Sequence, residues 1–113
     1  MSESPLACNL GAFTPEERAE HTDLLVGLRR RAIELRETED GYSFQFSADD
    51  LGKTARFVEL ERRCCPFLDF ELSIGRDDGP LWLRLGGREG VKELLWLELG
   101  LSEARSSPAL PIL

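Results

Sequence analysis

The fold that the sequence predicts depends on residues 40–47, which read Asp40-Gly41-Tyr42-Ser43-Phe44-Gln45-Phe46-Ser47. The aromatic residues alternate with small polar residues, which is the pattern of a strand with one buried face. The Asp-Gly pair that precedes them is a strong signal for a tight turn between two strands. Apolar and charged residues also alternate over residues 33–36, upstream of the turn. The sequence therefore predicts a β-hairpin with one apolar face.

A helix is the competing interpretation of the segment before the turn. Leu28, Ala32 and Leu35 also fit the 3.6-residue period of a helix that would continue to Arg36. The hairpin is preferred because a continued helix would leave the Asp-Gly turn unexplained. A helical conformation of residues 32–38 would disprove it.

Three helices and a second hairpin complete the expected order of elements. Thr14 and Glu17 form a capping box, so the first helix begins there and ends around residues 29–31. The second helix runs from about Ala48 to Cys64, because residues 47–50 again carry a capping signature. The remaining elements are strands over residues 68–74 and 81–85, and a third helix to about Leu99 that Gly100 closes.

The sequence therefore predicts one α+β domain over residues 14–100, with the order α-ββ-α-ββ-α. The two hairpins should form a four-stranded antiparallel sheet with helices on its apolar face. This order can be described as a degenerate ββα repeat. Residues 1–13 are expected to form an irregular arm, and residues 101–113 a flexible tail. The expected core contains Phe44, Phe46, Phe57, Leu60, Phe70, Leu72, Leu83 and Leu94.

Composition narrows the classes of function. The chain has 113 residues and a net charge of −7, which argues against a nucleic-acid or anionic-membrane partner. No stretch approaches the roughly 20 apolar residues that span a bilayer, and no secretory signal is visible. The expected location is the cytoplasm, where thiols stay reduced. An odd count of three cysteines also argues against a disulfide scaffold.

The chemistry of the chain is concentrated in residues 61–67, Glu61-Arg62-Arg63-Cys64-Cys65-Pro66-Phe67. Proline disfavours a helical conformation in the residue before it, so Cys64 should close the helix and Cys65 should be extended. This corner is expected to turn both thiols outward and let them converge on one ligand. The two neighbouring arginines are expected to offset the negative charge of thiolates.

The cysteine pair also has a purely structural interpretation. Cysteine is often buried, and Cys64 continues the apolar stripe of the second helix, so it could be a small core residue. A Cys64–Cys65 disulfide is disfavoured because neighbouring Cα atoms are about 3.8 Å apart, below the usual range of about 4.4–6.8 Å. A bridge from Cys8 to either thiol would be less strained.

Metal binding is the interpretation that best fits the spacing of the cysteines. Structural zinc sites typically have four ligands, with roughly two to four residues between paired cysteines. An adjacent pair plus the distant Cys8 suits ions that accept two or three sulfur ligands, such as Cu(I), Hg(II) or As(III). The sequence therefore predicts a soft-metal site with the ligands Cys8, Cys64 and Cys65.

The same residues carry a resemblance to a family. Residues 61–67, 79–85 and 86–92 resemble small, largely uncharacterised bacterial proteins with a Cys-Cys-Pro-Phe motif. These are similar to domains found beside, or fused to, mercury- and metal-responsive regulators. The likeness covers most of residues 6–97, and Cys8-Asn9-Leu10 is a matching N-terminal motif. At the level of fold, the ββα repeat also resembles the core of organomercurial lyase and of nitrous-oxide-reductase copper chaperones.

The main hypothesis is a cytosolic protein that binds a soft metal ion and is an accessory to metal resistance or sensing. It is expected to be a binding protein rather than an enzyme, with a metal-responsive regulator or transporter as its partner. Three alternatives remain open: carbon–mercury protonolysis with Asp69 as the acid, a thiol redox sensor, and an interaction module that exposes Trp82 and Trp96. His21 is expected to be a border residue of the first helix rather than a ligand.

Overall fold

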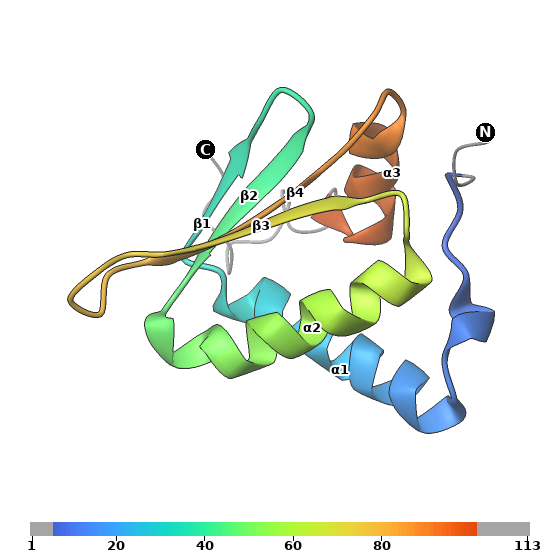
Figure 1. The fold of residues 1–113 in the computed structure, drawn as a ribbon, viewed down its shortest axis with the longest axis horizontal. Coiled ribbons are helices and arrows are strands. Elements are labelled where there is room, and N and C mark those ends of the chain that lie inside the picture. Colours follow the sequence, from blue (N-terminus) through green and yellow to red (C-terminus); the bar gives the residue numbers. More distant parts are fainter. Residues whose placement is uncertain (1–5, 102–113) are drawn as a thin grey trace.

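The computed structural model describes residues 6–101, whose elements follow the predicted order (Figure 1). The helices and strands are η1 (Leu10–Ala12), α1 (Pro15–Arg31), β1 (Glu34–Glu37), β2 (Gly41–Phe46), η2 (Ala48–Asp50), α2 (Leu51–Cys64), β3 (Asp69–Ile74), β4 (Leu81–Gly86) and α3 (Val91–Glu98), where η marks a short 3₁₀ helix. The α+β class and the order α-ββ-α-ββ-α are therefore confirmed.

The four strands form one antiparallel sheet in the order β1-β2-β4-β3. Each hairpin contributes one edge strand and one central strand, and the two central strands pair with each other, with Phe44 opposite Leu83. A helix follows each hairpin, since α2 follows β2 and α3 follows β4. The ββα order therefore occurs twice within the described residues.

The hairpin interpretation of residues 33–47 is confirmed, and the alternative of a continued helix is wrong. Helix α1 ends at Arg31, and Ala32 already has extended dihedral angles, φ −61° and ψ 127°. The backbone N–H of Ile33 then donates to the carbonyl of Gln45, which begins the ladder between β1 and β2. The β1–β2 register pairs Leu35 with Phe44, so both contribute to the same apolar face.

The start of the second helix differs from the prediction. Residues 48–50 form the 3₁₀ turn η2, and α2 begins at Leu51, three residues later than expected. Asp50 explains the difference, because its side chain is buried and bonded to Arg31, with 2.6 Å between Asp50 Oδ1 and Arg31 Nε. This ion pair fixes the turn to the end of α1.

The core lies between the helices and one face of the sheet (Figure 1). The buried side chains of β2 and β4 alternate with partly exposed ones on the uncovered face, as the period of a strand requires. Most of the predicted core residues are buried, but Leu72 is 38% exposed, and Phe70 and Leu94 are only partly buried. For Phe70 and Leu72 the reason is that β3 is an edge strand, so its apolar side chains lie at the margin of the covered face.

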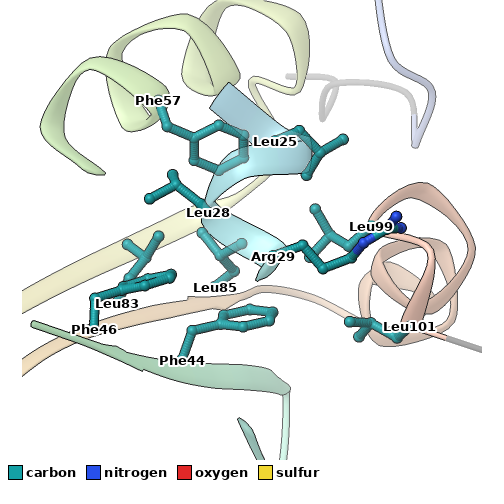
Figure 2. A pocket seen from close by; sticks show the side chains of 10 residues that line it. All are labelled: Leu25, Leu28, Arg29, Phe44, Phe46, Phe57, Leu83, Leu85, Leu99 and Leu101. Atoms are coloured by element: carbon teal, nitrogen blue, oxygen red, sulfur yellow. The ribbon is translucent and has the colours of Figure 1, made fainter. Parts of the chain in front are cut away.

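A small apolar cavity of about 30 Å³ lies inside this core (Figure 2). Its lining is Leu25, Leu28, Arg29, Phe44, Phe46, Phe57, Leu83, Leu85, Leu99 and Leu101. The volume suffices for one or two water molecules, so the cavity is a packing gap and not a ligand site. Leu101, the first residue of the predicted tail, is fully buried, and residues 102–113 lie outside the described part.

Within residues 6–101, no helix is long and apolar enough to cross a membrane.

Candidate metal centre

The helix-to-strand corner at Pro66 forms as predicted. Helix α2 ends at Cys64, and Cys65 leaves the helical region with φ −125° and ψ 73°. The N–H of Cys65 still donates to the carbonyl of Glu61, 2.7 Å away, so the corner follows the last helical turn directly. This change of direction gives the two neighbouring side chains different orientations.

The expectation that the corner exposes the thiols is wrong. Cys64 is 1% exposed and Cys65 is 0% exposed. Figure 1 shows the reason, since the N-terminal segment and α3 both lie beside the C-terminal end of α2. Phe67, directly after the corner, is also buried. The pair is therefore part of the interior, at a place where three segments meet.

Cys8 belongs to the same cluster. The backbone N–H of Asn9 donates to the carbonyl of Cys64 at 2.8 Å, which fixes the N-terminal segment to the end of α2. As a result, Cys8 Sγ lies 2.8 Å from Cys65 Sγ, and the three sulfur atoms of Cys8, Cys64 and Cys65 all lie within 4.8 Å of one another. All three cysteines are free thiols.

The three sulfurs differ in their affinity for a proton. The hydrogen bond from the Cys65 thiol lowers the pKa of Cys8 to about 6, although burial opposes the change. The same hydrogen bond and burial raise the pKa of Cys65, and burial raises the pKa of Cys64 to about 12. Of the three sulfurs, Cys8 is therefore the one that loses its proton most readily.

Two carboxyl groups stand beside the thiols. Glu61 lies on α2 and is fully buried, and Glu98 lies at the end of α3 and is partly buried. The two carboxylate oxygens of Glu98 lie 3.5 and 3.6 Å from Cys65 Sγ. One oxygen of Glu61, one oxygen of Glu98 and Cys65 Sγ all lie within 4.8 Å of one another. Burial and the neighbouring Glu61 carboxyl raise the pKa of Glu98 to about 10.

His21 holds the Glu61 carboxyl in place. His21 Nε2 lies 2.6 Å from Glu61 Oε1, and the imidazole sits between two phenyl rings, with centroid distances of 5.1 Å to Phe13 and 5.6 Å to Phe57. His21 is buried, so its expected place at the border of the helix is wrong. Its hydrogen bond goes to the Glu61 carboxyl and not to a cysteine sulfur.

Other predicted contributors lie elsewhere. Arg62 and Arg63 are exposed, and Arg63 pairs with Glu17 at 2.8 Å instead of offsetting thiolate charge. Asp69 is exposed at the start of β3 and is not in the cluster that the described residues form around the thiols. Trp82 and Trp96 are partly buried, and the Arg36 guanidinium lies 4.6 Å from the centre of the Trp82 ring.

Sequence reasoning missed the two glutamates. The sequence did contain an indication for Glu61. It lies three residues before Cys64 and four before Cys65, which is one helical turn away on the same side of the helix. Glu98 had no such signal, since it comes from a helix 33 residues beyond Cys65. The mixed sulfur and oxygen character of the cluster thus depends on tertiary packing.

Comparisons with known proteins leave the site to be interpreted from its own geometry. No protein-family model matches the chain, and neither a curated protein nor a solved structure shows significant similarity to it. The resemblance to the Cys-Cys-Pro-Phe proteins stays a prediction.

Proposed function

We propose that this protein binds one soft metal ion through the thiolates of Cys8, Cys64 and Cys65. The observation that carries the proposal is the convergence of three sulfur atoms within 4.8 Å, from segments more than 50 residues apart in the chain. A lone buried cysteine is an ordinary core residue, but three that meet at one point form a ready ligand set.

The surroundings suit an ion that binds sulfur. The site is largely buried, so bulk water competes poorly for the ion. One sulfur already has a pKa below neutrality, and a bound cation deprotonates the other thiols outright. Ions of the Hg(II), As(III) and Cu(I) class accept two or three sulfur ligands. A role as an accessory to metal resistance or sensing, with a regulator or transporter as partner, is part of this proposal.

The test is titration of the reduced protein with Hg(II), As(III), Cu(I) and Zn(II). We expect one tight site for a soft ion, lost in Cys65→Ser and weakened in Cys8→Ser and Cys64→Ser. Asp69→Asn is the matched control, because this exposed carboxylate close to the pair in sequence lies outside the cluster and its variant should bind as the wild type. Equal binding by wild type and Cys65→Ser would remove the proposal.

A thiol redox switch is the second candidate, favoured by the 2.8 Å between Cys8 Sγ and Cys65 Sγ. The Cys8 thiolate would attack peroxide to form a sulfenic acid and release water or hydroxide. The Cys65 thiol would then displace a second water to give a Cys8–Cys65 disulfide. Peptide mapping after mild peroxide treatment decides this: a Cys8–Cys65 peptide supports the switch, and three thiols that are still alkylatable exclude it.

A further inference from the structure

The buried carboxyl of Glu61 has one oxygen that the protein leaves without a stable partner. Oε1 is bonded to His21 Nε2 at 2.6 Å. Oε2 is fully buried and receives no hydrogen bond from a nitrogen or hydroxyl group of residues 6–101. Buried polar atoms are nearly always paired, so this oxygen requires an explanation.

The groups beside Glu61 do not supply a hydrogen-bond partner for this oxygen. Beside it lie the Glu98 carboxyl and the Cys65 thiol, both of which are acids. One oxygen of each glutamate and the Cys65 sulfur lie within 4.8 Å of one another, so three groups that can ligate a metal surround the same point. A cation held between these groups would give the buried Oε2 a partner.

A cation at this point would have both sulfur and oxygen donors. Cys65 is common to two groups of three ligand atoms, one with Cys8 and Cys64 and the other with Glu61 and Glu98, each within 4.8 Å. His21 acts as a positioning residue, because its hydrogen bond fixes Glu61 with Oε2 left to the cluster. Packing of the imidazole between Phe13 and Phe57 restrains this orientation.

We infer that Glu61 and Glu98 are oxygen ligands of the same ion that Cys65 binds, so that the site also takes divalent cations of the Cd(II) and Zn(II) class, which accept sulfur and oxygen ligands together. The inference rests on the proposed thiol site. Cu(I) favours sulfur alone and brings one positive charge, whereas Zn(II)-type ions accept thiolate and carboxylate ligands together and bring two. Two carboxylates next to thiolates thus suit the higher charge.

The experiment measures Cd(II) and Hg(II) affinity by competition with a chelator, in the wild type, Glu61→Gln and Glu98→Gln. We expect each amide variant to lose at least tenfold in Cd(II) affinity and to change less than threefold for Hg(II), which needs only sulfur. Glu93→Gln is the matched control, because Glu93 is exposed on the same helix as Glu98. Unchanged Cd(II) affinity in both amide variants would overturn the inference and leave the thiol site intact.

X-ray absorption at the cadmium edge adds a readout that can be taken on the wild type itself and then compared with the variants. The wild type loaded with one equivalent of Cd(II) should show both sulfur and oxygen neighbours, with fewer oxygens in Glu98→Gln. A first shell of sulfur alone, or an oxygen shell unchanged in both amide variants, contradicts the inference. If the wild type does not bind Hg(II) at all, the proposed function itself is wrong.

Discussion

At the scale of single residues, the thiol proton of Cys65 determines the charge on Cys8. Its hydrogen bond lowers the pKa of Cys8 to about 6, so the Cys8 thiolate is present above that pH and is lost below it. In Cys65→Ala the donor is gone, and the pKa of Cys8 should rise toward the ordinary value of about 8.5. The rate of Cys8 alkylation by iodoacetamide between pH 5 and 9, followed by mass spectrometry of its peptide, measures this change. A wild-type rate that rises only above pH 8 would contradict it.

Leu60 shows the energetic contribution of the core at the same scale. Its side chain is fully buried on α2, so Leu60→Ala should lower the free energy of unfolding by about 2–5 kcal/mol. Leu97→Ala is the control, since that side chain is 73% exposed and the change should stay within about 0.5 kcal/mol. Urea denaturation of the metal-free proteins compares the two. Similar losses in both variants would show that the core is wrongly placed.

At the scale of elements, the sequence predicted the hairpins and the corner because their signals are local. The Asp-Gly turn and the alternation after it specify β1 and β2, and Pro66 ends α2 where expected. Burial of the corner was not predictable, because its covering segments come from residues near Cys8 and from α3. Strand periodicity also predicted burial of Leu72, but not that β3 would be an edge strand.

Two Gly→Ala variants test the placement of the elements, because one should lower the stability of the protein and the other should raise it. A Cβ added at Gly41 would lie 1.9 Å from the carbonyl oxygen of Leu85, so Gly41→Ala should disrupt the pairing of β2 with β4. A Cβ at Gly27, inside α1, meets nothing within 4 Å, and Gly27→Ala should stabilise the protein by about 0.5–1 kcal/mol through helix propensity. Thermal unfolding of both variants gives the comparison. A stabilising Gly41→Ala would mean that the register is wrong.

At the scale of the whole molecule, the site exists only in the folded chain. It joins the N-terminal segment, the end of α2 and the end of α3, which lie far apart in the sequence. An ion bound there should stabilise the native state by about 2.7 kcal/mol at a free concentration of one hundred times its dissociation constant. Affinity of the unfolded thiols for the ion would reduce this value. Denaturation with and without the tightest-binding ion, in wild type and Cys65→Ser, should show the gain in wild type alone.

The central claim is that three cysteines bind one soft ion together, and X-ray absorption at the mercury edge tests it most directly. The protein is reduced, loaded with one equivalent of Hg(II) and freed of small thiols before measurement. The account predicts a first shell of three sulfur atoms, with the sulfur count reduced in Cys8→Ser and binding lost in Cys65→Ser. A first shell of nitrogen or oxygen atoms, or fewer than three sulfur neighbours in the wild type, would contradict it.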